Sequence, residues 1–216
     1  MIKVLVVDDH ELMREGLLAL LRDRPQVRAV GECADGRTAV KLAARLAPDV
    51  VVMDVGMPGM NGVEACRQIT AASDKVKVLA LSMRADEKYV LRMCDAGASG
   101  YVLKESAFEE LDEAIRCVAR GGLYLSRRLG TVAVRGSVSL DPPARAAGCP
   151  GLTAREREVL QLIAEGNSTR SMAEQLDVSV KTVEAHRGHI MKKLDLHSVA
   201  ELTKYAVREG LTDLEH

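Results

Sequence analysis

The first 120 residues alternate short apolar runs with longer amphipathic stretches. The apolar runs are continuous, and the strongest of them are rich in β-branched residues; they lie at residues 4–7, 27–33, 50–53, 78–81 and 100–103. Continuous apolar runs of this length are typical of strands that are covered on both faces. Helical periodicity fills the stretches between them, near 11–23, 36–46, 61–72, 86–96 and 107–119. Strands that alternate with helices predict a doubly wound α/β domain with a five-stranded parallel sheet.

From Leu152 onwards the periodicity is purely helical. Four helices are expected, at 154–165, 169–176, 180–194 and 199–208. Polar residues at capping positions mark several helix starts: Thr153 with Glu156, Ser198 with Glu201, Ser106 with Glu109, and singly Ser168 and Ser179. Only a short break separates the second and third of the four helices. These are the proportions of a helix-turn-helix, so a small all-α, four-helix domain is predicted here.

The segment between these two regions has a different composition. Residues 125–148 contain glycines and prolines without sustained periodicity, apart from a short helix expected near 126–134. Such composition is typical of a linker. The predicted organisation is therefore an α/β domain at 1–124, a linker at 125–148 and a helical domain at 149–216.

Composition narrows the classes of function. The chain has 216 residues, a formal net charge of -1 and only 2% aromatic residues, which disfavours binding that relies on aromatic stacking. Its five cysteines are scattered, with no metal-knuckle spacing, and are expected to be small buried hydrophobes in a reducing compartment. No charged-then-apolar N-terminal segment and no apolar run near ~20 residues is present. A cytoplasmic protein without a membrane partner is expected.

Acidic residues follow two of the predicted strands. Asp8 and Asp9 come directly after the first strand, and Asp54 comes after the third. In an open α/β sheet, ligands bind at the carboxyl ends of the strands, and in the flavodoxin-like order strands one and three are neighbours there. Three clustered carboxylates repel one another unless a hard cation lies among them. Mg²⁺ fits, because it takes carboxylate, water and phosphoryl oxygens.

Two further strand ends reach the same edge. Ser82 ends the fourth strand and Lys104 follows the fifth. A lysine ammonium is a point charge suited to a phosphoryl oxygen, and a serine hydroxyl can donate to the same group. This set can bind a metal ion and accept a phosphoryl group on an aspartate. Taken singly, each residue has a plainer interpretation: a solvated strand end for Asp8 with Asp9, and a surface charge for Lys104.

The segments VLVVDDH, VVMDVGMPGMNGVEA, LALSM and GYVLKES resemble the receiver domain of two-component response regulators, over residues 1–120. The resemblance implies that Asp54 is the phosphoacceptor. It also implies that Asp8, Asp9 and Asp54 bind Mg²⁺ together with the backbone carbonyl of Gly56.

The same resemblance assigns roles to the remaining residues of the pocket. Ser82 and Lys104 would contact the phosphoryl group, and Tyr101 would be the switch residue that turns inward on activation; its plainer interpretation is core packing. Pro58 and Gly62 would shape the loop after Asp54. The sequence departs from the pattern at Glu105, where receivers often carry proline, but a glutamate there is expected still to hold Lys104 in place.

The helix predicted at 180–194 is basic. It carries Lys181, Arg187, Lys192 and Lys193 against Glu184, a net of about three positive charges, as phosphate neutralisation requires. Its expected core residues are Val180, Val183, Ile190 and Leu194. A solvated charged face is the plainer interpretation, and His186 and His189 are expected to pack or to lie near phosphates rather than to bind metal.

LTAREREVL and VSVKTVEAHRGHIMKKL resemble the LuxR-type domain of the NarL/FixJ family of response regulators, over residues 152–211. The resemblance implies base contacts from Glu184, Ala185 and Gly188, although Gly188 replaces a bulkier residue. It implies phosphate contacts from the positions Lys181, Thr182, Arg187 and Lys192. A dimer that uses the last helix, with exposed Leu202 and Val207, is also implied.

These expectations combine into a response regulator that is not an enzyme. A histidine kinase would phosphorylate Asp54 and thereby control homodimerisation, sequence-specific binding to double-stranded DNA and transcription, with RNA polymerase as a further candidate partner. Two alternatives stay open. One is a magnesium-dependent phosphatase, although such enzymes keep one residue between their aspartates and Asp8 and Asp9 are adjacent. The other is a DNA-binding protein whose receiver half only dimerises.

Overall fold

The computed structural model describes residues 1–129 and 151–212, which form two compact units. The first unit is a parallel sheet in the order β2-β1-β3-β4-β5-β6. Its strands are β1 (Ile2–Val7), β2 (Val27–Cys33), β3 (Val50–Asp54), β4 (Lys77–Ser82), β5 (Gly100–Leu103) and β6 (Tyr124–Leu125). This order confirms the doubly wound, flavodoxin-like fold, with one strand more than the five predicted.

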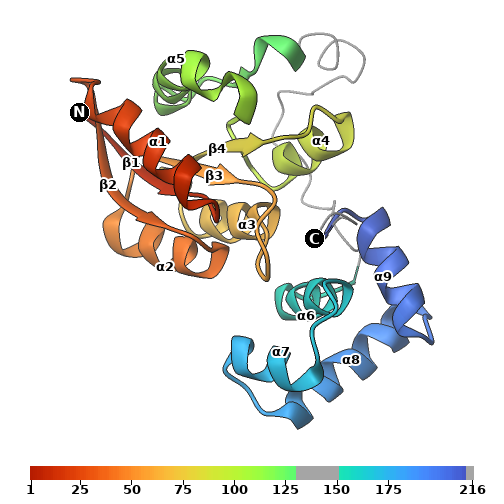
Figure 1. The fold of residues 1–216 in the computed structure, drawn as a ribbon. Helices are drawn as coiled ribbons and strands as arrows, with labels where there is room; N and C mark the ends of the chain where they lie inside the picture. Colours follow the sequence, from red (N-terminus) through yellow and green to blue (C-terminus); the bar gives the residue numbers. More distant parts are fainter. Residues whose placement is uncertain (130–150, 213–216) are drawn as a thin grey trace. The chain divides into compact units, whose positions relative to one another are not determined.

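Five helices cover the two faces of this sheet (Figure 1). They are α1 (Glu11–Arg22), α2 (Gly36–Leu46), α3 (Gly62–Ala72), α4 (Glu87–Asp95) and α5 (Ala107–Ala119). Their bounds agree with the predicted segments to within one residue at either end. Leu17 of α1 and Leu111 and Ile115 of α5 are buried in one core with Val4 and Val52 of the sheet. The strands read as continuous apolar runs because helices cover both of their faces.

The sixth strand lies at the start of the predicted linker. Tyr124 and Leu125 pair with Gly100 and Tyr101, and the Ser126 amide donates to the Tyr101 carbonyl at 2.8 Å. A short 3-10 helix, η2 (Arg127–Leu129), follows and buries Leu129 against the unit. The residues up to Leu129 are thus part of the sheet unit, and the rest of the helix expected near 126–134 lies outside the described residues.

The start of α5 differs from the predicted capping box. A 3-10 helix, η1 (Lys104–Ser106), precedes α5 directly, so that Ser106 has helical backbone angles and its side chain makes no capping hydrogen bond. A capping residue needs extended backbone, which lets its side chain turn back to the first free amides. The capping-box prediction at Ser106 with Glu109 is therefore wrong.

The second unit is all helical. Its helices are α6 (Ala154–Ala164), α7 (Thr169–Leu176), α8 (Val180–Leu194) and α9 (Val199–Arg208), and they share one core, so the four-helix prediction is confirmed. Thr153 and Glu156 form the predicted capping box. Ser168 and Ser179 each cap the next helix through their side chains. Ser198 also caps α9, but the Glu201 carboxylate accepts from the His197 amide and the Ser198 hydroxyl.

Two apolar residues of this unit lie elsewhere than predicted. Val180, expected in the core, begins α8 and is 43% exposed, whereas Val183 and Ile190 are fully buried. Leu202, expected on an exposed face of the last helix, is fully buried in the core of the unit. Leu202 is therefore not available for a dimer contact.

Candidate functional site

The sheet register brings the predicted acidic residues to one edge. Val7 of β1 is paired with Met53 of β3, so the residues that follow them, Asp8 and Asp54, are neighbours at the carboxyl ends of adjacent strands. Ser82 lies at the end of β4 opposite Leu103 of β5, and the next residue in the chain is Lys104. Parallel pairing therefore gathers side chains that are scattered in the sequence between Asp8 and Lys104.

Lys104 links the two buried carboxylates. Its Nζ lies 2.8 Å from Asp8 Oδ2 and 2.8 Å from Asp54 Oδ2. Asp8 is fully buried and Asp54 is 3% exposed. Burial raises the pKa of Asp54 above its ordinary range, and the Lys104 ammonium opposes that rise. Burial tends to lower the pKa of Lys104, but the Asp54 and Asp8 carboxylates outweigh it and raise the pKa.

The backbone after Asp54 is tightly packed. The Gly56 amide donates to Asp54 Oδ1 at 3.2 Å, and the Gly62 amide donates to the Val55 carbonyl at 3.0 Å. A Cβ on Gly62 would lie 2.1 Å from the Asp54 carbonyl oxygen, so only glycine fits at the first position of α3. Gly59 has φ +74 within this loop. The loop thereby holds Asp54 in place from the main chain.

Ser82 and Tyr101 are connected through the loop after β4. The Arg84 amide donates to Ser82 Oγ at 3.1 Å, and the Tyr101 hydroxyl donates to the Arg84 carbonyl at 2.9 Å. Tyr101 is 1% exposed, and burial raises its pKa to about 12. In this structure the aromatic side chain lies inward, and its hydroxyl contacts the same residue that contacts Ser82.

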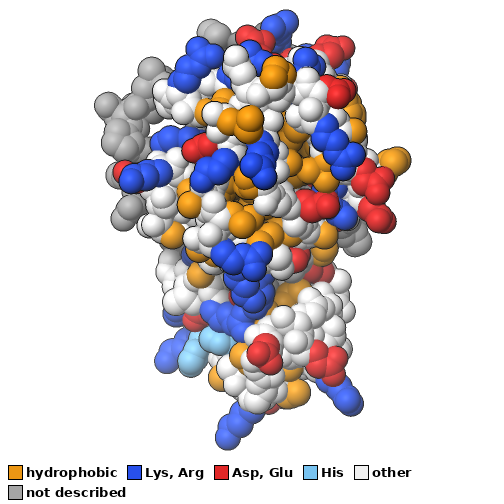
Figure 2. Space-filling view, turned by 90° about the vertical axis from the view of Figure 1, so that its left-hand side faces the viewer, with side chains coloured by type: hydrophobic (Ala, Val, Ile, Leu, Met, Phe, Trp, Pro, Cys, Tyr) orange, Lys and Arg blue, Asp and Glu red, His pale blue; other side chains and the backbone are white. Residues whose placement is uncertain are grey.

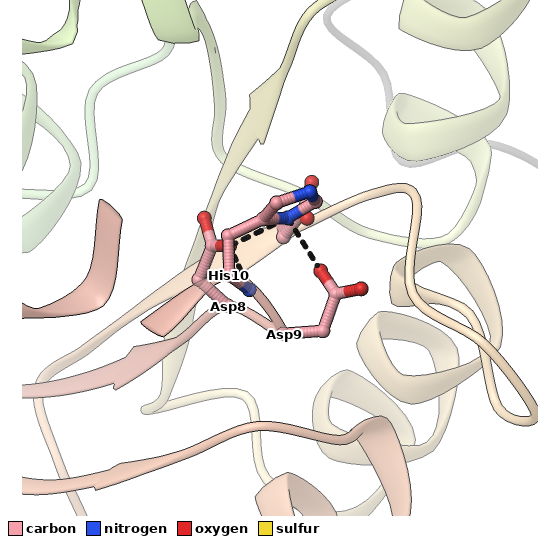
Figure 3. Close-up of side chains that lie close together, drawn as sticks. Asp8, Asp9 and His10 are labelled. Carbon is pink, nitrogen blue, oxygen red and sulfur yellow. Dashed lines mark hydrogen bonds and ion pairs between the residues drawn. The ribbon is translucent and has the colours of Figure 1, made fainter. Parts of the chain in front are cut away.

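His10 is a residue of this site that was not predicted from the sequence. It follows Asp9 directly, and its Nδ1 lies 3.0 Å from Asp9 Oδ1 and 3.4 Å from Asp8 Oδ1 (Figure 3). Its backbone amide also donates to Asp8 Oδ1 at 2.9 Å. The available signal was its position beside two adjacent aspartates, because a residue at a strand end stays at the same edge as its neighbours.

The donor set of the pocket fits a divalent cation. One ligand atom from each of Asp8, Asp9, His10 and Asp54 lies within 4.8 Å of the others. Carboxylate oxygens are the ligands that a hard divalent cation prefers, and these atoms lie close enough together to share one ion. In addition, Asp8 Oδ2 is buried and makes no hydrogen bond of suitable geometry, although Lys104 lies at ion-pair distance. A cation would satisfy that oxygen.

The candidate DNA-binding residues lie along α8. Lys181, Glu184, Ala185, Gly188 and Lys192 are exposed there, whereas Thr182 and Arg187 are half-buried. Figure 2 shows histidine side chains beside Lys and Arg side chains on this unit. Nothing lies within 4 Å of where a Cβ would stand on Gly188, which leaves this part of the helix surface bare of side-chain atoms.

Lys193 differs from the other basic residues of α8. Its Nζ donates to Glu156 Oε2 at 2.7 Å and thus joins α8 to the capping box of α6. This ion pair takes Lys193 out of the basic charge that α8 offers to a ligand. The sequence count of net charge on the helix could not distinguish this internal pair from a surface charge.

The cysteines are consistent with small core residues only in part. Cys66 is fully buried, and burial raises its pKa well above the usual range. Cys33, Cys94 and Cys117 are half-buried free thiols, and Cys149 lies outside the described residues.

None of the helices in residues 1–129 and 151–212 combines the length and apolarity that a membrane crossing requires.

Known proteins similar to this chain match both units. The family described as "Response regulator receiver domain" matches residues 4–116, and "Bacterial regulatory proteins, luxR family" matches residues 150–206. Transcriptional regulatory protein LiaR of Bacillus subtilis (strain 168) is 38% identical over 214 residues, which cover 99% of this chain and 100% of LiaR.

Solved structures give the same result. The two-component response regulator of the LuxR family from Aurantimonas sp. SI85-9A1 is 35% identical, with a TM-score of 0.60, and the match covers 62% of this chain and 96% of that chain. The RcsB response regulator in complex with DNA is 24% identical, with a TM-score of 0.58 and coverage of 94% and 96%. At that identity the likeness concerns the fold alone.

The fold, the pocket and these matches define the class of the protein: it is a two-component response regulator that acts in transcription, not an enzyme. Within that class, the chain belongs to the NarL/FixJ family, whose members join a receiver domain to a LuxR-type DNA-binding domain. The predicted family, fold class and general function are confirmed.

Proposed function

We propose that Asp54 accepts a phosphoryl group from a histidine kinase and that phosphorylation controls DNA binding by α8. The observation that carries this proposal is the Lys104 ammonium, which lies 2.8 Å from both Asp54 and Asp8 at the strand edge. When Asp54 becomes phosphorylated, its carboxylate loses the charge that held Lys104, and the ammonium becomes available to the phosphoryl oxygens.

Mg²⁺ is the proposed cofactor. Asp8, Asp9 and Asp54 would hold it together with the Gly56 carbonyl, and when bound it would neutralise charge on the transferred phosphoryl group. The chain's own residues then read the product: Lys104 and the Ser82 hydroxyl bind phosphoryl oxygens. Ser82 movement is transmitted to Arg84, which the Tyr101 hydroxyl also contacts. Tyr101 is thus the residue that reports occupancy of the pocket to the α4–β5 face.

For DNA we propose that α8 enters the major groove of double-stranded DNA. Glu184, Ala185 and Gly188 would face base edges, and four neighbouring positions would contact phosphates: Lys181, Thr182, Arg187 and Lys192. The exposure of Lys181 and Lys192 supports this assignment. Two copies of the chain, dimerised after phosphorylation, would then read two half-sites, and RNA polymerase is a further candidate partner.

The proposed domain organisation follows the sequence prediction. The receiver domain spans 1–124, the linker 125–148 and the DNA-binding domain 149–216, with the packing of residues 125–129 on the sheet as an anchor for the linker. Because the kinase donor and the chromosome are both met in the cytoplasm, we place the protein there.

The test is the intact mass of the full chain after incubation with Mg²⁺ and a small-molecule phosphodonor. Wild type should gain one phosphoryl group, and Asp54→Asn should gain none. The phosphorylated wild type should then bind promoter DNA more tightly than Asp54→Asn treated alike. Equal phosphoryl uptake by the two proteins would show that the phosphoacceptor is a residue other than Asp54. Uptake without any change in DNA binding would contradict the proposal that phosphorylation controls DNA binding by α8.

A further inference from the structure

The oxygens of the pocket fall into two groups. Lys104 Nζ lies 2.8 Å from the Oδ2 atoms of Asp8 and Asp54. The Oδ1 atom of Asp8 instead faces His10, whose Nδ1 lies 3.4 Å away and also lies 3.0 Å from Asp9 Oδ1. An imidazole nitrogen therefore stands among carboxylate oxygens on the side of the pocket that the ammonium does not occupy.

The local backbone accounts for the position of this imidazole. His10 is the N-cap residue of α1, with extended backbone angles, but its side chain makes no capping hydrogen bond. Its own amide donates to Asp8 Oδ1 at 2.9 Å, which fixes the residue against the pocket. The ring is thus free of a helix-capping role, and Figure 3 shows it between the carboxylates of Asp8 and Asp9.

The composition of the donor set bears on the identity of the cation. His10, Asp8, Asp9 and Asp54 each offer a ligand atom within 4.8 Å of the others. Mg²⁺ takes oxygen ligands, whereas imidazole suits later first-row transition ions such as Co²⁺, Ni²⁺ and Zn²⁺. A site made only of carboxylates would therefore favour these transition ions over Mg²⁺ less than a site that also has a nitrogen ligand.

We propose that His10 Nδ1 is a direct ligand of the cation in this pocket and raises its affinity for transition ions relative to that for Mg²⁺. His10 Nδ1 lies at hydrogen-bond distance, 3.0 Å, from Asp9 Oδ1, and a carboxylate oxygen only accepts. Binding to the ion therefore replaces this hydrogen bond and requires the tautomer with its proton on Nε2, which presents the Nδ1 lone pair to the ion. The inference deepens the proposed function, because it rests on the same cation site and adds a fourth side chain to it. Other oxygen positions around the ion remain for water and a phosphoryl group.

The first test compares cation selectivity in the full chain. The dissociation constants of Co²⁺ and Mg²⁺ are measured for wild type, His10→Ala and His10→Gln. The ratio of the two constants should shift against Co²⁺ by about tenfold or more in both variants, as the loss of metal-site partners typically does. The matched control is His197→Ala, because His197 is an exposed histidine 3.4 Å from the carboxylate of Asp195 outside the pocket. A ratio within twofold of wild type in both His10 variants overturns the inference.

The second test is a spectroscopic signature of the bound nitrogen. Mn²⁺ in the wild-type pocket should show the pulsed-EPR coupling of one directly bound ¹⁴N, and His10→Ala and His10→Gln should both lack it. Mn²⁺ bound to wild type without that coupling overturns the role of His10 and leaves the phosphoacceptor proposal intact. If wild type and Asp9→Asn both fail to bind Mn²⁺ or Mg²⁺, the cation site itself is wrong, and both proposals fall.

Discussion

The two units hold their functional charges in opposite ways. In the receiver unit, Asp8, Asp54 and Lys104 are at most 9% exposed, and Lys104 contacts both carboxylates directly. In the helical unit, Lys181 and Lys192 project from α8 into solvent. The first group comes from three strand ends, and the second from the two ends of one helix.

This difference has an energetic consequence. Charges buried in a medium of low dielectric interact strongly, and removal of one partner leaves the others uncompensated. Exposed charges are hydrated and screened by salt, so they add little to stability and are free to meet a ligand. Substitutions in the receiver pocket should therefore change the stability of the fold, whereas substitutions on α8 should mainly change DNA binding.

The largest expected effect is that of Lys104→Ala. Loss of the ammonium leaves Asp8 and Asp54 buried and facing each other, which should reduce the free energy of unfolding by about 4 kcal/mol. Urea denaturation of the full chain measures this. Mg²⁺ should restore part of the loss, because a cation can take the place of the ammonium between the carboxylates. A loss below about 1 kcal/mol without Mg²⁺ would contradict a strongly coupled pocket.

Gly62→Ala should have the next largest effect. The added Cβ would lie 2.1 Å from the Asp54 carbonyl oxygen, and relief of that clash should cost about 3 kcal/mol and displace the phosphoacceptor. Gly188→Ala is the matched control in the other unit, because nothing lies within 4 Å of its Cβ position. There, alanine should stabilise the helix by about 1 kcal/mol. Denaturation curves of both variants, with phosphoryl uptake for the first, make the comparison.

Glu156→Ala tests an exception in the helical unit, a buried carboxylate. Glu156 accepts from the Thr153 amide at 2.7 Å and from Lys193 Nζ at 2.7 Å, and its loss should cost about 2 kcal/mol. Hydrogen exchange of the α6 amides in the full chain measures it. Glu174→Ala, which breaks an exposed pair with Arg170, should cost less than about 0.5 kcal/mol.

The Glu156 contribution should also depend on pH. Burial acts to raise its pKa, but the contacts with Lys193 and Thr153 outweigh burial and lower the pKa below its ordinary value. A carboxylate with a lowered pKa in the folded state stabilises above its unfolded pKa, near 4.5, and this stability is lost as the pH falls through the folded value. The difference between wild type and Glu156→Ala should therefore shrink below about pH 4.5. A constant difference down to pH 3 would contradict the ion pair.

The smallest effect on stability is expected for Lys181→Ala and Lys192→Ala, below about 0.5 kcal/mol each. In DNA binding, however, each should weaken affinity for all sequences alike and lower the slope of log affinity against log salt by about 0.9. Binding measured at several salt concentrations tests this. Lys204→Ala, an exposed lysine of α9, is the control and should leave the slope as it is. Unchanged slopes for both α8 variants would show that Lys181 and Lys192 do not contact DNA phosphates.

Several features of the structure could be predicted from the sequence, because the sequence patterns that specify them are local. Helical periodicity and side-chain caps fixed α6 to α9 almost to the residue, and Thr153 with Glu156 formed the expected capping box. Continuous apolar runs located the five longer strands for the same reason. The site residues Asp8, Asp54 and Lys104 could be selected because each directly follows such a run, and parallel strands end at a common edge.

Other outcomes required contacts between distant parts of the chain. The two-residue strand β6 has no periodicity of its own and forms only because Gly100 and Tyr101 offer an edge for it. Ser106 failed as a cap because a 3-10 helix continues the chain from Lys104 into α5. Lys193 lies among the basic residues of α8 in the sequence, but in the structure it forms an ion pair with Glu156.

The sequence by itself therefore determined the elements, the fold class and the residue types at the strand ends, because propensity, periodicity and capping act over a few neighbouring residues. Only the tertiary structure decided which charges are buried together, that Lys104 joins Asp8 to Asp54, and that His10 lies among the carboxylates. Burial and distance set the strength of these interactions, and both depend on strands and helices that meet across the sheet rather than along the chain.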